Sequence, residues 1–217
     1  MAERVEIDLS HGWSFVRRRA RKAWLSGREA GGETVDLPHC WNARDTFVEG
    51  LDYYRGAGSY RRTFELPARA GEAQLEWALE SEGFYGFGDI WLDGRRLGAV
   101  NGGYLGFRRP LSSSLGPGRH VAGLRLSNSH RRNVLPGIRM PDFILYGGLS
   151  GRVFLRGRPP LRLDEDVHVR QESVSRESAV LRIGFSAVNR GDRERKVRAV
   201  WTLKDAAVLV VSSARAG

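Results

Sequence analysis

The residues Asp89-Ile90-Trp91-Leu92-Asp93-Gly94-Arg95-Arg96-Leu97 predict a tight hairpin between two strands. Asp93 and Gly94 both tolerate a positive φ, which the two-residue turns of β-hairpins require. Apolar and polar residues alternate with period two over residues 59–66 and 75–79, which we expect to be half-buried strands. We expect further strands at residues 11–15, 104–111 and 121–126. No segment up to residue 126 shows a helical period with caps, so we expect an all-β sandwich.

Two further features predict breaks between these strands. Asn101-Gly102-Gly103-Tyr104 has the composition of a turn, because glycine and asparagine adopt turn conformations readily. Pro38 cannot donate a ladder hydrogen bond, and we therefore expect its segment at an edge or in a loop.

A long segment without periodicity follows the strand that ends near Leu126. Residues 128–155 contain Pro136, Pro141 and Gly147-Gly148, which restrict or release the backbone at fixed points. An irregular segment of this length among short strands is either disordered or functional. Its only carboxylate is Asp142, and we expect a shaped loop that presents Asp142 at the rim of the sandwich. The alternative is that Asp142 caps a turn after Pro141.

The charge of the chain favours no particular partner. Its 217 residues carry a net charge of +10, but the arginines are scattered, and the only cluster is Arg17-Arg18-Arg19 with Arg21-Lys22. Scattered positive charge is typical of a soluble surface, so we do not expect a nucleic-acid partner, although an arginine-rich nucleic-acid binder stays an alternative.

The chain also predicts no metal, cofactor or membrane site. Its single cysteine, Cys40, excludes an internal disulfide and a thiolate zinc site, and we interpret it as a small buried side chain. The five histidines match no ligand spacing, and no glycine-rich stretch opens a helix as a phosphate loop would. Without an apolar signal core or a run of membrane-spanning length, we expect a cytoplasmic protein with no membrane partner.

Pro159-Pro160 marks an expected domain boundary, which divides the chain into residues 1–158 and 159–217. Beyond it, apolar residues alternate over 181–187 and again over 197–203, with a turn at 189–192 between them. This pattern is typical of an immunoglobulin-like β-sandwich, which takes about 100 residues when complete. Fewer residues remain, and the last apolar run is Val208 to Val211, so we expect this domain to be incomplete.

Seven short blocks, in this order along the chain, resemble glycoside hydrolase family 2, the β-galactosidase-like enzymes. The resemblance covers residues 8–155 well and 160–217 more loosely. The blocks are Asp36-Leu37-Pro38-His39-Cys40-Trp41-Asn42 and residues 54–64, 90–94, 97–98, 102–107, 127–129 and 147–149.

The resemblance implies a modular enzyme. Its first domain is a jelly-roll (galactose-binding-like) sugar-binding sandwich, its second an immunoglobulin-like sandwich, and its third a (β/α)₈ barrel with two catalytic glutamates. We therefore expect residues 1–158 to be the jelly roll and 159–217 part of the second sandwich, with no catalytic residue in this chain. The expected partners are the catalytic barrel and, in the full enzyme, a β-galactoside-like carbohydrate.

The resemblance also implies one contribution to the active site. In galactosidases of this family, an aspartate just before the glycine turn reaches the sugar subsite of the barrel, and Asp142, six residues before Gly148, matches it. A carboxylate can accept hydrogen bonds from two adjacent sugar hydroxyls. Trp41 and Asn42 are further candidates for carbohydrate binding, since an indole stacks on a pyranose and an amide bonds its hydroxyls. Their alternative is a core position for Trp41 and a loop-ordering role for Asn42.

Two other functions remain open. The same jelly roll is compatible with a stand-alone carbohydrate-binding module, which would bind sugar without a barrel. The chain is also compatible with a truncated remnant of a glycosidase that has no independent role.

Overall fold

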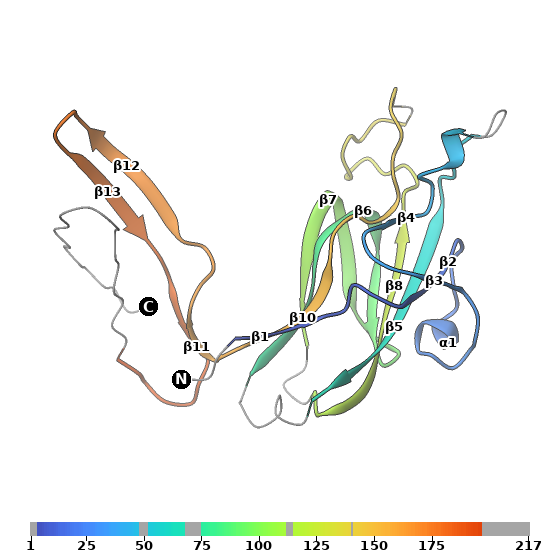
Figure 1. Ribbon diagram of the computed structural model, residues 1–217, viewed down its shortest axis with the longest axis horizontal. Helices are drawn as coiled ribbons and strands as arrows, with labels where there is room; N and C mark the ends of the chain where they lie inside the picture. The colour runs from blue at the N-terminus through green and yellow to red at the C-terminus, as the bar shows by residue number, and fades with distance from the viewer. Residues whose placement is uncertain (1–3, 48–51, 68–74, 112–114, 140, 197–217) are drawn as a thin grey trace. The chain divides into compact units, whose positions relative to one another are not determined.

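The computed structural model describes residues 4–47, 52–67, 75–111, 115–139 and 141–196. Contacts divide the chain into two compact units, Met1–Pro160 and Leu161–Gly217. The first unit carries a ten-stranded antiparallel sheet, and the second carries two short ribbons (Figure 1). The prediction of an all-β chain is confirmed, because the only helices among the described residues are α1 (Lys22–Leu25) and the 3₁₀ turn η1 (Asp45–Phe47).

The sheet of the first unit is curled. Its strands hydrogen-bond in the order β1-β10-β6-β8-β5-β2-β3, β7 pairs with β6, and β9 pairs with β4 and β6. The strands are β1 (Val5–Asp8), β2 (Trp13–Val16), β3 (Glu33–Val35), β4 (His39–Cys40), β5 (Ala57–Leu66), β6 (Glu76–Leu92), β7 (Arg95–Pro110), β8 (Gly118–Ser127), β9 (Gly148–Leu149) and β10 (Val153–Arg158).

The curl follows from the length of β6. The first part of this strand pairs with β10 and its last part pairs with β8, while β7 accompanies it along most of its length. Because β6 changes partner along its course, the sheet bends around one core (Figure 1). The predicted hairpin between β6 and β7 is confirmed: Leu92 pairs with Arg95, and Asp93 and Gly94 have φ of 50° and 77°.

Two expectations about this hairpin were wrong in detail. The separate strands predicted at 75–79 and before Asp93 are parts of the single strand β6. The predicted turn at residues 101–104 lies inside β7, where Gly102 pairs with Gly86 and Gly103 with Tyr85. The register shifts beside these pairs and Tyr104 has φ of 61°. The glycines therefore mark an irregularity in a continuous strand rather than a reversal of the chain.

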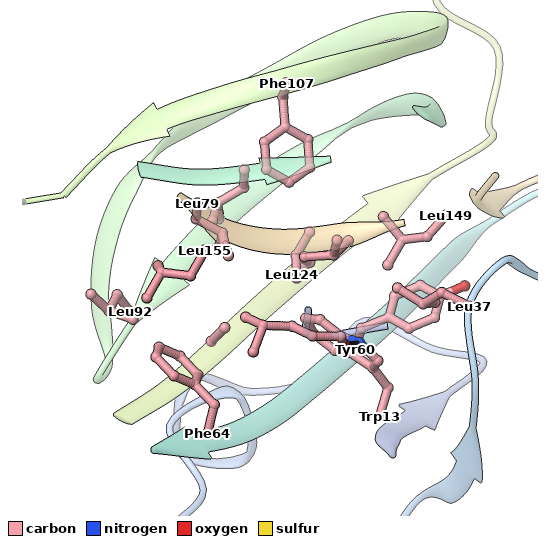
Figure 2. Close-up of a cluster of buried hydrophobic side chains, with 14 of the residues drawn as sticks. Trp13, Leu37, Tyr60, Phe64, Leu79, Leu92, Phe107, Leu124, Leu149 and Leu155 are labelled. Carbon is pink, nitrogen blue, oxygen red and sulfur yellow. Dashed lines mark hydrogen bonds between the residues drawn. The ribbon is translucent and has the colours of Figure 1, made fainter. Parts of the chain in front are cut away.

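The core lies between the two sides of the curled sheet. The predicted inward face of β5 is confirmed, since Tyr60, Phe64 and Leu66 are all buried. They meet residues of β2, β6, β8 and β10, as Figure 2 shows for Trp13, Leu79, Leu124 and Leu155. Burying one such leucine stabilises the fold by about 1.5–3 kcal/mol. The core therefore ties strands distant in sequence into one body.

The second unit contains two antiparallel pairs. β11 (Leu161–Leu163) pairs with β14 (Ala187–Asn189), and β12 (His168–Val174) pairs with β13 (Ala179–Gly184). The predicted strands at 197–203 and Val208 to Val211 lie outside the described residues. The assignment of this unit to an incomplete immunoglobulin-like domain, and of residues 1–158 to a jelly roll, stays a prediction.

Candidate carbohydrate-binding site

The loop that carries Asp142 connects β8 to β9. The predicted irregular segment runs from Asn128 to Gly147, after which the chain forms β9 and then β10 from Val153. Figure 1 shows the loop at the end of the sandwich where β4 and η1 also lie. We call residues 129–147 the rim loop.

Asn128 anchors the first end of the rim loop. Its side chain is fully buried, and its Nδ2 donates to the carbonyl oxygens of Tyr54 at 3.0 Å and Leu145 at 2.8 Å. Its Oδ1 accepts a hydrogen bond from the N–H of Gly56 at 2.8 Å. One amide therefore joins the two ends of the rim loop to the segment before β5. Buried polar groups need such partners, since leaving one unpaired costs about 1–3 kcal/mol.

Asn42 anchors the other end from the opposite side. It is also fully buried, and its Nδ2 donates to the same carbonyl of Leu145 at 3.0 Å. Its Oδ1 accepts from the N–H of Gly147 at 2.9 Å and from the thiol of Cys40 at 3.2 Å. We call Asn42 and Asn128 the asparagine clasp, because both amides hold Leu145.

The glycine pair is required for this closure. A Cβ on Gly147 would lie 2.2 Å from the indole of Trp41, and a Cβ on Gly148 would lie 2.2 Å from the carbonyl oxygen of His39. Gly148 also has φ of 139°, a conformation that other residues rarely adopt. Glycines here let the chain pass directly over β4.

Two tyrosines hold the middle of the rim loop against β6 and β7. Tyr85 donates its hydroxyl to the carbonyl oxygen of Leu135 at 3.0 Å, and Tyr104 accepts from the N–H of Tyr146 at 3.1 Å. Burial raises the pKa of both phenols, so both stay protonated at neutral pH. Val134 and Leu145 pack on Tyr85. The rim loop is therefore a packed structure with its own small core.

Asp142 lies on the exposed side of this packed loop. It makes no hydrogen bond or ion pair with any residue that the structure describes, so no turn-capping bond is seen in that part of the chain. The loop also exposes large apolar side chains at Leu135, Ile138, Phe143 and Tyr146. Exposed apolar side chains that gather on one loop are typical of a surface that contacts another protein domain.

Trp41 and Asn42 lie beneath the rim loop. Trp41 is buried and stacks on Phe15 with ring centroids 6.1 Å apart, and Asn42 is fully buried in the clasp. Their observed contacts are therefore those of a core residue and a loop-ordering residue. Direct sugar binding by either side chain, like that by Asp142, stays a prediction.

A pocket of about 520 Å³ opens beside Trp41. Its lining combines aromatic and charged side chains: Phe15, Arg17, Glu33, His39, Trp41, Arg44 and Asp45, with Cys40 and Ala43. Sequence reasoning missed this pocket, because its lining comes from three separate segments, residues 15–17, 33 and 39–45. The carboxylate of Asp45 in this lining is already paired with Arg17 at 3.1 Å and accepts a hydrogen bond from the N–H of Tyr54 at 2.8 Å.

The pocket offers hydrogen-bonding groups rather than a nucleophile. Desolvation lowers the pKa of His39, whose Nδ1 lies 2.9 Å from the hydroxyl of Tyr60, so the imidazole is neutral at pH 7. Burial raises the pKa of the Cys40 thiol, and a neutral thiol is a weak nucleophile. Among the described residues, no group of three or more His, Cys, Asp or Glu side chains could hold a metal ion. In the same part of the chain, no helix is long and apolar enough to cross a membrane.

Comparisons with known proteins identify relatives of the chain. No protein-family model matches it. It is 28% identical over 158 residues to a β-glucuronidase of Bacteroides fragilis, which covers 71% of this chain and 21% of that protein. It is 26% identical over 219 residues to a β-galactosidase of Bacteroides ovatus, which covers 95% of this chain and 24% of that protein. Most of the matched relatives are named β-glucuronidases, so the β-galactosidase-like resemblance is only partly confirmed.

A solved structure of a β-glucuronidase is similar to this chain as well. The β-glucuronidase 2 of Bacteroides uniformis, covalently bound to cyclophellitol-6-carboxylate aziridine, matches with a TM-score of 0.72 and 25% identity, over 83% of this chain and 22% of that one. This chain spans about a quarter of the length of the curated relatives it matches. The chain is thus a relative of β-glucuronidases and a β-galactosidase of glycoside hydrolase family 2, and it has the fold of their N-terminal β-sandwich domains.

Proposed function

We propose that this chain is the non-catalytic N-terminal portion of a family 2 glycosidase, and that the rim loop supports a catalytic (β/α)₈ barrel and lends Asp142 to its sugar subsite. The observation that carries this proposal is an exposed carboxylate, without a hydrogen-bond or ion-pair partner among the described residues, on a loop that two buried amides hold in place. Binding groups work best on rigid supports, because little freedom is then lost when the ligand binds.

The relatives support the barrel as the missing partner. About three quarters of each curated relative lies outside the match, which leaves room for a barrel of about 250 residues. The exposed apolar side chains of the rim loop, among them Phe143 and Leu135, suit a contact with such a body. We therefore expect the rim loop to face the barrel and Asp142 to lie at that contact.

The substrate we propose is a β-glucuronide, with a β-galactoside as the second candidate. The names of most matched relatives support the first, and that of one supports the second. The carboxylate of Asp142 would repel the carboxylate of a glucuronide, so it suits the hydroxyls that the two sugars have in common. Asp142 therefore fits either substrate and does not discriminate between them.

A first experiment measures the mass of the natural product by immunoblot against the first unit. A band several times larger than 24.3 kDa supports the proposal, and a band at 24.3 kDa contradicts it. In the second case, sugar binding by the pocket beside Trp41, as in a stand-alone carbohydrate-binding module, becomes the function to test.

A second experiment places Asp142→Ala in the complete enzyme. The loss of two charged hydrogen bonds, about 3 kcal/mol together, should lower kcat/KM about 100-fold for an aryl β-glucuronide or β-galactoside. The control is Asp166→Ala, since Asp166 is an exposed carboxylate of the second unit and should change kcat/KM less than twofold. An unchanged kcat/KM in Asp142→Ala, or hydrolysis by the isolated 217-residue chain that scales with its purity, would refute the proposal.

A further inference from the structure

The basic cluster of the sequence has no part in the proposed function. We call Arg17, Arg18, Arg19, Arg21 and Lys22 the basic rim. All five residues are exposed. They lie between the end of β2 and the first turn of α1, on the segment that curves outside the sheet (Figure 1).

The backbone of the basic rim is fixed on the sheet. The hydroxyl of Ser59, on β5, accepts a hydrogen bond from the N–H of Ala20 at 3.0 Å and donates to the carbonyl oxygen of Arg18 at 2.8 Å. The guanidinium of Arg125, on β8, donates to the carbonyl oxygen of Ala20 at 2.7 Å. The five cations therefore occupy a defined surface and do not belong to a loose basic tail.

An apolar contact below the basic rim completes this anchoring. Ala20, Trp24 and Leu25 are buried and pack against Trp91 of β6. The guanidinium of Arg61 lies 4.6 Å from the ring centroid of Trp24 and donates to its carbonyl oxygen at 2.9 Å. The apolar side chains of this segment are thus buried against the sheet, and its charged side chains face the solvent.

Most cations of the basic rim have no ion-pair partner in the part of the chain that the structure describes. Arg17 pairs with Asp45, whereas the other four residues make no ion pair with any described residue. The nearby Asp89 is paired with Arg96 at 2.5 Å. Desolvation and the charge of Arg19 together lower the pKa of Arg125. A bound anion would relieve this excess of positive charge.

The pocket beside Trp41 adjoins the basic rim, because Arg17 belongs to both. Arg44 adds a second guanidinium to its lining, which also contains the carboxylates of Glu33 and Asp45, the latter paired with Arg17. Its volume of about 520 Å³ is within the range of about 300–1,000 Å³ that small-ligand sites occupy. A sugar ring of an anionic chain could enter this pocket while neighbouring carboxylates contact the basic rim.

We propose that the basic rim and the adjoining pocket bind a polyuronate, a polysaccharide that carries a carboxylate on each sugar. The choice of a polysaccharide rests on the proposed glycosidase function. Guanidinium groups bind carboxylates with paired, charge-assisted hydrogen bonds, and a polyuronate repeats such carboxylates along its length. Binders of single-stranded nucleic acid use aromatic platforms on which bases stack, whereas the nearby Trp24, Trp41 and Trp91 are buried. The rim would hold the polymer while its end is hydrolysed elsewhere.

The test measures binding of polygalacturonate to the 217-residue chain by isothermal titration calorimetry at 50 mM salt, with neutral dextran alongside. We expect binding of polygalacturonate only, with an affinity that falls as salt rises. The triple variant Arg18→Ala, Arg19→Ala, Arg21→Ala should lose about tenfold or more in affinity and depend less on salt. None of these side chains enters the core, so the fold should persist, as circular dichroism would verify.

A matched control removes three exposed arginines of the second unit, Arg170, Arg176 and Arg193. This variant has the same net charge as the first and should bind within about twofold of the unmodified chain. Equal losses in the two variants, no binding by the unmodified chain, or duplex DNA bound at least as tightly as polygalacturonate would each overturn the proposal. Asp142→Ala should leave polymer binding unchanged, which separates this test from that of the proposed function.

Discussion

Replacing Asn128 by alanine tests the asparagine clasp. The change removes two hydrogen bonds from Nδ2, to the carbonyls of Tyr54 (3.0 Å) and Leu145 (2.8 Å), and one to Oδ1 from the N–H of Gly56 (2.8 Å). The Leu145 carbonyl keeps Asn42 as a donor, but the partly buried N–H of Gly56 loses its side-chain partner. At about 1 kcal/mol for each bond, the free energy of unfolding should fall by about 3 kcal/mol.

This loss can be measured by urea denaturation. Five of the six tryptophans lie in the first unit, so tryptophan fluorescence reports mainly on the sandwich. A loss of about 3 kcal/mol corresponds to a fall in Tm of about 6–12 °C for a domain of this size. The control is Asn133→Ala, because Asn133 is exposed and its side chain makes no hydrogen bond with a described residue; its effect should stay within about 0.5 kcal/mol.

A double-mutant cycle sharpens the test. Asn42 and Asn128 share the carbonyl of Leu145, so the effects of Asn42→Ala and Asn128→Ala should not add. If Asn128→Ala costs less than about 1 kcal/mol, or if the two effects add within about 0.5 kcal/mol, the clasp does not hold the rim loop. The placement of Asp142 would then need another explanation.

Two further predictions concern the sandwich itself. The Nδ1 of His120 lies 2.8 Å from the carboxylate of Asp93, and its Nε2 lies 2.8 Å from the carbonyl oxygen of Gly116. Desolvation lowers the pKa of His120, but these two hydrogen bonds outweigh desolvation, so the pKa is raised. The stability that protonated His120 contributes is therefore present below its ordinary pKa of about 6.5 and is lost as pH rises through the raised value. The difference in Tm between the unmodified chain and His120→Gln should then be larger at pH 5.5 than at pH 8.5. A difference in Tm that is the same at both pH values would contradict this. Gly86 has φ of 103° and its Cβ would lie 1.9 Å from the carbonyl oxygen of Ser127, so Gly86→Ala should lower the free energy of unfolding by more than about 3 kcal/mol. Gly116→Ala, with nothing within 4 Å of its Cβ, should change it by less than about 0.5 kcal/mol, and equal effects of the two substitutions in urea denaturation would refute the steric argument.

Much of the strand arrangement could be predicted from the sequence. Period-two alternation placed Tyr60, Phe64 and Leu66 on the buried face of β5, and Asp93-Gly94 predicted the β6–β7 hairpin. These features are local, since side chains alternate across a strand and tight hairpin turns require positive φ. Turn composition gave a wrong prediction at Gly102-Gly103. Glycine permits a positive φ both in a turn that reverses the chain and in an irregularity of a continuous strand, so its presence does not distinguish the two.

The sequence also indicated the family relationship and Asp142 as the candidate sugar ligand, but only the tertiary structure decided how the rim loop is held. Asn128 meets Tyr54 and Gly56 across more than 70 residues, and the lining of the pocket comes from three separate segments. Such long-range contacts leave no periodic pattern in the sequence, because an amide or a guanidinium side chain can bond any suitable group that the fold brings near it. The period of two determined which faces of the strands are buried, and long-range packing around β6 decided which loops share an end of the sandwich.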